Sequence, residues 1–176
     1  MKNLLSTIVL ANGLLLGASA LAQTCSTDVN LTKPDDRYTV NSNGTVTDNK
    51  TDLIWQACSV GETYDADAAT CTGAPAGKDW QAAFVAVQDA NTNRALGYSD
   101  WRLPSIAELR TLTDKACTSP AINTTVFPTA GNNSYWSSSA SVRSVHEAWS
   151  INFTTGVDGY EPKTRPWYVR LVRGGH

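Results

Sequence analysis

The chain has 176 residues, 41% of them hydrophobic and 17% charged, which suits one ordinary domain with an apolar core and excludes collagen, a coiled coil and wholesale disorder. The formal net charge is −2, so no global basic field favours nucleic acid or an anionic membrane. Only two histidines are present, which leaves little material for metal or acid–base chemistry. We therefore expect a binding scaffold with no cofactor, no metal site and no catalytic residues.

Residues 1–22 have the pattern of a bacterial secretory signal peptide. Lys2 precedes an apolar run, residues 4–16, and the segment ends in Ala20-Leu21-Ala22. The run is too short to span a bilayer comfortably, and no later stretch approaches about 20 apolar residues. We expect cleavage before Gln23 and an exported protein, whether secreted, periplasmic or at the cell surface. The remaining chain divides into an N-terminal arm, 23–36, and a domain, 37–176.

All four cysteines follow the predicted signal peptide, and an even number of cysteines in an oxidising compartment favours disulfide bonds. Three pairings are possible. We favour Cys58–Cys71, because the sequence between them looks like a loop that needs a clamp, and Cys25–Cys117, which would tie the arm to the domain. A metal site is disfavoured because no CxxC motif occurs and the histidines are far from the cysteines.

The first predicted elements are β-strands. Residues 38–40 and 45–47 are β-prone runs on either side of Asn41-Ser42-Asn43-Gly44, which is a hairpin signal. A second turn precedes the apolar strand 53–55. The stretch 58–79 is predicted to be a loop.

Two helices follow. In 79–93, Trp80, Ala83, Phe84 and Val87 have the spacing of a single apolar stripe. In the second helix, Ser105 and Glu108 form a capping box, and the buried face is made of Ile106, Leu109 and Leu112.

The last part of the chain returns to strands at 135–136, 148–153 and 167–173. In the last strand the side chains alternate, with Trp167, Val169 and Leu171 on one face and Tyr168 and Arg170 on the other. Strands, two helices and more strands indicate an α+β fold. Five tryptophans are expected to pack in the core: Trp55, Trp80, Trp101, Trp136 and Trp149.

Several of these motifs, read in order, resemble the Lcl C-terminal domain family, which is named for a Legionella collagen-like adhesin. The resemblance covers roughly residues 37–175. It rests on Thr45-Val46-Thr47-Asp48, Leu53-Ile54-Trp55-Gln56, Gly97-Tyr98-Ser99-Asp100-Trp101-Arg102-Leu103-Pro104, Glu108-Leu109, Pro120-Ala121-Ile122-Asn123, Phe127-Pro128, Tyr135-Trp136-Ser137-Ser138-Ser139, Ala148-Trp149 and Tyr168-Val169-Arg170-Leu171-Val172-Arg173-Gly174-Gly175.

The resemblance implies a C-type-lectin-like fold, related to that of formylglycine-generating enzymes, and a secreted or surface binding role with glycosaminoglycan-like polyanions as ligands. It also implies a homo-oligomer, a trimer in relatives. One departure is Asp52, where the family turn has Gly; Asp tolerates left-handed backbone, so we expect the turn to survive. Glu161-Pro162-Lys163 lacks the calcium-ligating amide of sugar-binding lectins, and the last cysteine, Cys117, comes too early for formylglycine chemistry.

We predict that loops within 140–165 are displayed to a glycan or protein ligand. Sulfated sugars are bound by convergent cations, and the C-terminal third carries Arg143, Lys163, Arg165, Arg170 and Arg173; of these Arg173, like Arg102, lies in a family motif and is expected to be structural. The predicted ligand-binding residues are Arg143, His146, Asp158, Tyr160, Lys163, Arg165 and Trp167.

Two alternatives stay open. An exported hydrolase could use one of Ser137, Ser138 and Ser139 with His146 and either Glu147 or Asp158, although the chain has no G-x-S-x-G elbow. A structural component of an envelope or fibre is the other alternative.

Overall fold

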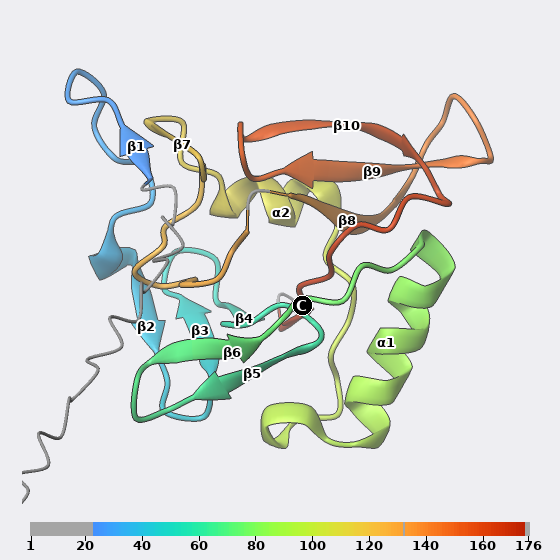
Figure 1. Cartoon of the computed structure of the whole chain (residues 1–176), viewed down its shortest axis with the longest axis horizontal. Coiled ribbons are helices and arrows are strands. Elements are labelled where there is room, and N and C mark those ends of the chain that lie inside the picture. Colours follow the sequence, from blue (N-terminus) through green and yellow to red (C-terminus); the bar gives the residue numbers. More distant parts are fainter. Residues whose placement is uncertain (1–22, 132, 175–176) are drawn as a thin grey trace, which may run out of the picture.

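The computed structural model describes residues 23–131 and 133–174 (Figure 1). The predicted signal peptide lies outside the described residues. Within them, no helix is long and apolar enough to cross a membrane. Helices and small antiparallel sheets share one fold, which confirms the α+β class; the more specific C-type-lectin-like assignment stays a prediction.

The first sheet is antiparallel, with strand order β11-β4-β3-β2. Its strands are β2 (Tyr38–Val40), β3 (Thr45–Asp48), β4 (Leu53–Gln56) and β11 (Val172–Arg173). The predicted hairpin is confirmed, with Val40 opposite Val46. The turn before β4 also survives, because Asp52 adopts the left-handed conformation at φ 57° while Asp48 accepts hydrogen bonds from Lys50 N and Thr51 Oγ1.

The prediction that residues 58–79 form a loop is wrong in part. Strands β5 (Glu62–Asp65) and β6 (Thr70–Gly73) form an antiparallel hairpin there. The Cys58–Cys71 disulfide is formed as predicted and joins β6 to the segment ahead of β5. The hairpin could not be recognised from the sequence, because most positions of its strands are half-buried or exposed and carry polar residues. The strands therefore show no alternation of apolar and polar residues.

Both predicted helices are present. Helix α1 (Trp80–Thr92) begins at Asp79, whose side chain accepts a hydrogen bond from Ala82 N. Its stripe is only partly as predicted: Ala83 is buried, but Phe84 is 38% exposed and has an edge contact with the partly buried Trp80. Helix α2 (Ile106–Leu112) has the predicted capping box and buries Leu109 and Leu112, while a short 3-10 turn, η2 (Ala95–Gly97), follows α1.

The second sheet contains β8 (Ser134–Ala140), β9 (Glu147–Asn152) and β10 (Val157–Pro162), in the order β10-β9-β8. It lies at the top of Figure 1, where α2 packs against β8 and β9. Strand β10 corrects the expectation of display loops across 140–165, because only the connections around it are loops. Residues such as Asp158, Gly159 and Pro162 have low β-propensity, yet all six residues of β10 pair with β9.

Residues 167–173 run between the two sheets. Only Val172 and Arg173 form a regular strand, but the predicted alternation is confirmed. Val169 and Leu171 lie in one core cluster with Trp101 and Trp136. Tyr168 packs against the other cluster, which contains Trp55.

Arg170 corrects the sequence analysis, because it is fully buried and not part of a surface cationic set. Its guanidinium carbon lies 4.8 Å from the Phe127 ring centroid and 5.7 Å from that of Tyr135. The same group donates hydrogen bonds to the carbonyls of Gln56 and Ala57. Both faces of the 167–173 segment are covered, so alternation alone does not reveal which residues are exposed.

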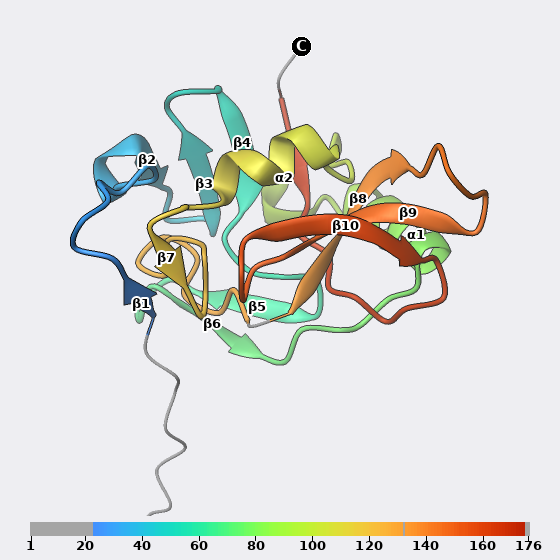
Figure 2. The same cartoon turned by 90° about the horizontal axis from the view of Figure 1, so that it is seen from above.

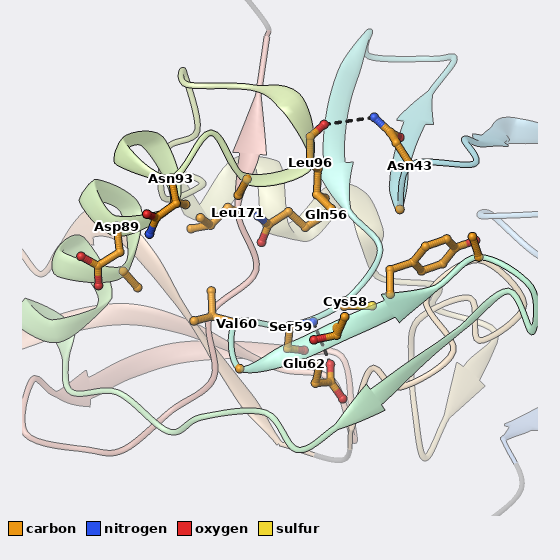
Figure 3. Close-up of a pocket in the computed structure, with 18 of the residues that line it drawn as sticks. Asn43, Gln56, Cys58, Ser59, Val60, Glu62, Asp89, Asn93, Leu96 and Leu171 are labelled. Carbon is orange, nitrogen blue, oxygen red and sulfur yellow. Dashed lines mark hydrogen bonds between the residues drawn. The ribbon is translucent and has the colours of Figure 1, made fainter.

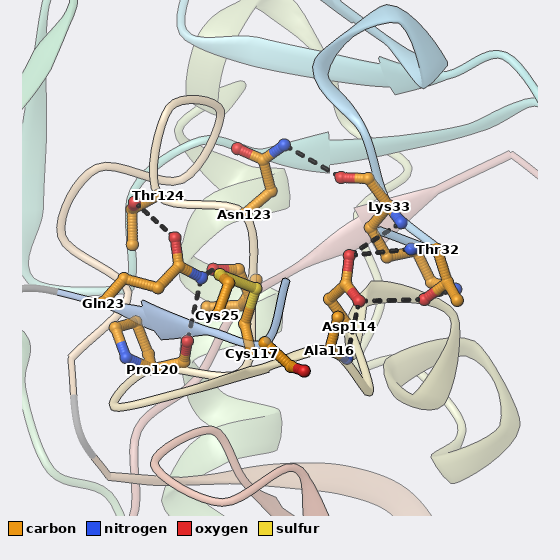
Figure 4. Close-up of a disulfide and its surroundings, with 12 residues drawn as sticks. Gln23, Cys25, Thr32, Lys33, Asp114, Ala116, Cys117, Pro120, Asn123 and Thr124 are labelled. Atoms are coloured by element: carbon orange, nitrogen blue, oxygen red, sulfur yellow. Dashed lines mark hydrogen bonds between the residues drawn. A yellow bond between two sulfur atoms is a disulfide. The ribbon is translucent and has the colours of Figure 1, made fainter. Parts of the chain in front are cut away.

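The N-terminal arm is bound to the domain. Strand β1 (Thr24–Cys25) pairs with β7 (Cys117–Thr118), and the predicted Cys25–Cys117 disulfide joins them (Figures 2 and 4). Gln23 Nε2 donates to the carbonyls of Pro120 and Ile122. Further along the arm, the Asp114 carboxylate accepts hydrogen bonds from the backbone of residues 32–33. A disulfide that closes a loop of 92 residues is worth about 4.6 kcal/mol by chain entropy.

Arg170→Ala tests the buried guanidinium. The substitution removes a large side chain from a closed core and two donors from backbone carbonyls, so we expect the free energy of unfolding to fall by about 3–5 kcal/mol. Chemical denaturation followed by tryptophan fluorescence measures this change. A loss below about 1 kcal/mol would contradict the structural role of Arg170.

Candidate functional site

Two aromatic side chains lie opposite each other on β9 and β10. Trp149 and Tyr160 are cross-strand partners, and their ring centroids are 4.1 Å apart with an interplanar angle of 41°. Trp149 shares its face of the sheet with Ile151, which packs with Leu109 of α2. Trp149 itself is only partly buried, so the expectation that it packs in the core is wrong: it lies at the border of this face.

Two arginines extend this aromatic pair on both sides. The guanidinium carbon of Arg110, from α2, is 5.4 Å from the Trp149 ring, and that of Arg143, from the β8–β9 loop, is 4.8 Å from the Tyr160 ring. We call these four residues the arginine–aromatic row: Arg110, Trp149, Tyr160 and Arg143. An open hollow beside the row is lined by Ser144, Glu147, Asp158 and Gly159 together with three of its members.

The two arginines of the row differ electrostatically. Arg110 forms a two-point pair with Asp158, Nε to Oδ1 at 3.1 Å and Nη2 to Oδ2 at 2.6 Å. This hydrogen bonding lowers the pKa of the Asp158 carboxyl and raises that of Arg110. Arg143 is exposed, and its guanidinium forms no ion pair among residues 23–131 and 133–174. The row thus offers one occupied and one open guanidinium.

The structure divides the predicted site into separate groups. Arg143, Asp158 and Tyr160 lie together at the row, but His146 and Lys163 line a different hollow beside Trp80. Lys163 Nζ is 4.2 Å from the Trp80 ring and donates to the Val145 carbonyl. The β8–β9 loop connects the two hollows, because Arg143 and Ser144 line one and Val145 and His146 line the other.

The remaining predicted residues lie further along the chain. The Arg165 Nε is 4.0 Å from a Glu161 carboxylate oxygen, and its guanidinium is 5.9 Å from the Trp167 ring. Trp167 is half-buried, and its backbone forms a β-bridge with Lys78. Its ring is therefore not fully exposed for stacking against a ligand.

The two motif arginines have the structural contacts that the sequence suggested. Arg102 pairs with Glu108 of the α2 capping box, and Arg173 pairs with Asp100.

The serines of the hydrolase alternative have structural partners. The buried Ser137 hydroxyl donates to the Trp149 carbonyl at 2.8 Å. Ser138 Oγ donates to the Pro104 carbonyl, and Ser139 Oγ accepts from Ile106 N at the start of α2. Asp158 is engaged by Arg110. These contacts explain the serine run without a catalytic role.

The sequence analysis missed Arg110 and assigned Trp149 to the core. Arg110 belongs to a helix, and nothing in the local sequence shows that this helix packs against β9. The register that brings Tyr160 opposite Trp149 could have been found only by assigning β10 as the partner strand of a hairpin.

Residues 44–173 match the Lcl C-terminal domain family. The chain belongs to that family. No curated protein matches the chain significantly. All four members of the row fall within the part of this Lcl C-terminal domain that matches the family.

The ion pair at the row can be tested by titration. In Arg110→Ala, the Asp158 carboxyl loses the partner that lowers its pKa, so we expect this pKa to rise toward the ordinary value of 3.8. Side-chain carboxyl NMR shifts measure it. Arg165→Ala is the matched control and leaves the pKa of Asp158 unchanged. No rise in Arg110→Ala, or an equal rise in the control, would contradict this assignment.

Proposed function

We propose that the chain is an exported, non-enzymatic, adhesin-like domain that binds an acidic glycan at the arginine–aromatic row. Export is supported by the two disulfides, which persist in oxidising compartments. A binding role is supported by membership of the Lcl C-terminal domain family. The trimer implied by the family resemblance stays a prediction.

The observation that carries this proposal is the open guanidinium of Arg143. A guanidinium stacked on an aromatic ring keeps its N–H donors in its own plane, and the fork matches the two oxygens of a carboxylate or sulfate. The Arg143 guanidinium lies over the Tyr160 ring, while Asp158 already fills the corresponding fork of Arg110. Arg143 is therefore the residue of the row whose N–H donors are available to bind an oxyanion.

The surroundings of Arg143 favour binding by limiting the entropy lost when a ligand is ordered. Tyr160 is fixed by strand pairing and by contact with Trp149, which Arg110 supports from the other side. The row is thus largely ordered before the ligand arrives.

A glycan with several acidic groups fits better than one with a single acidic group. Lys163 and His146 line the hollow on the other side of the β8–β9 loop, so a chain of acidic sugars that crosses this loop would meet a second cation. A protein surface with clustered carboxylates is the competing ligand, and the sugar probe below separates the two.

Calorimetric titration of residues 23–176 with a defined heparin hexasaccharide tests the proposal. We expect Arg143→Ala to lower the affinity about tenfold or more, because a charge-assisted contact is lost, and Arg143→Lys to lower it less. Lys50→Ala, in the exposed turn between β3 and β4, is the matched control for loss of one positive charge and keeps the wild-type affinity. Binding should weaken as salt rises.

Two results would contradict the proposal. One is the absence of any heparin binding by the folded wild type. The other is an Arg143→Ala affinity equal to that of Lys50→Ala.

A further inference from the structure

A cavity of about 460 Å³ lies between α1, the β5–β6 hairpin and the β2–β3 turn (Figure 3). Its apolar lining comes from Val60, Ala86, Ala90, Leu96 and Leu171. This volume lies within the range of small-molecule sites. The cavity shares no lining residue with the arginine–aromatic row, so it is independent of the proposed function.

The side-chain amide of Gln56 is a polar group that a ligand in this cavity could reach. Gln56 is 9% exposed and lines the cavity, where Figure 3 shows its side chain directed between Leu171 and Val60. Its backbone is fixed, because Gln56 N donates to the Leu171 carbonyl and Gln56 O accepts from Arg170. Its side-chain amide has no hydrogen bond to any residue in the described part of the chain. Its amide atoms are accessible from the cavity and are free to pair with a ligand.

Three other polar groups around the cavity are either occupied or exposed. Glu62 accepts hydrogen bonds from Ser59 N and Thr129 Oγ1. Asp89 and Asn93 are exposed on α1, where water can hydrate them. The Gln56 amide is therefore the group that would select a ligand inside the apolar part of the cavity.

The rim is held in a strained conformation. Leu96 has a left-handed backbone at φ 53°, which is uncommon for a residue with a side chain. Its carbonyl accepts a hydrogen bond from Asn43 Nδ2 at 3.2 Å, which joins η2 to the β2–β3 turn across the cavity (Figure 3). Leu96 is thereby held at the wall of the cavity.

We propose that this cavity binds a small uncharged molecule with an apolar body and an amide that presents N–H and C=O on the same edge. Gln56 offers one acceptor, Oε1, and a donor, Nε2, so such an amide can form two hydrogen bonds with it while its body contacts Leu171 and Val60. Primary amides and lactams have this edge. Ordinary open-chain secondary amides do not, because their N–H and C=O point in opposite directions.

NMR titration of ¹⁵N-labelled residues 23–176 tests the proposal with two probes, benzamide for a primary amide and ε-caprolactam for a lactam. We expect saturable shifts of the Gln56 side-chain amide and of the Val60 and Leu96 backbone amides with at least one probe. N,N-dimethylbenzamide keeps the apolar body but has no donor. Its affinity should therefore be at least about tenfold lower than that of benzamide.

Two variants separate recognition from folding. Gln56→Leu removes the donor and the acceptor, and Ala90→Leu fills the cavity from α1 without changing Gln56; both should abolish the saturable shifts. Ala107→Leu, at an exposed position of α2, is the control and keeps them. The proposal is overturned if neither probe binds, if dimethylbenzamide binds as well as benzamide, or if folded Ala90→Leu retains wild-type affinity.

Discussion

The segment 167–173 is the constraint on which the fold depends, because it contacts almost every other layer. Val172 pairs with Trp55 of β4 and bridges to Arg102 ahead of α2, while Tyr168 bridges to Tyr135 of β8 and Trp167 to Lys78 ahead of α1. Its alternate side chains enter the two different core clusters. A single short segment thus connects the two larger sheets and the segments that lead into the two helices.

This arrangement explains how a chain with few long elements can present an ordered surface. The second sheet is anchored at β8 by the central segment, and β9 and β10 extend from β8 toward the row. The two disulfides act elsewhere, on the arm and on the β5–β6 hairpin. The central segment and α2 therefore support the row, whereas α1, the Cys58–Cys71 disulfide and Leu171 of the central segment shape the Gln56 cavity. The two proposed sites share no lining residue, although the central segment contributes to the support of both.

The sequence was informative wherever a signal is local. The Asn-Gly turn after Val40, the Ser105–Glu108 capping box and the pairing of the four cysteines are all confirmed. It was not informative where exposure depends on distant packing. Arg170 looks like a surface cation but is enclosed by aromatic rings, and Trp149 looks like a core residue but borders a surface hollow. Likewise, only the fold brings Arg110 to Trp149.

The arginine–aromatic row is the surface at which we expect the ligand to bind. A map of backbone and indole NMR shifts in labelled residues 23–176, recorded while a heparin tetrasaccharide is added, tests it most directly. We expect the largest shifts on residues 141–146, on β9 and β10 and on the Trp149 indole. Saturable shifts confined to the β2–β3–β4 face, with the Trp149 indole unmoved, would contradict it.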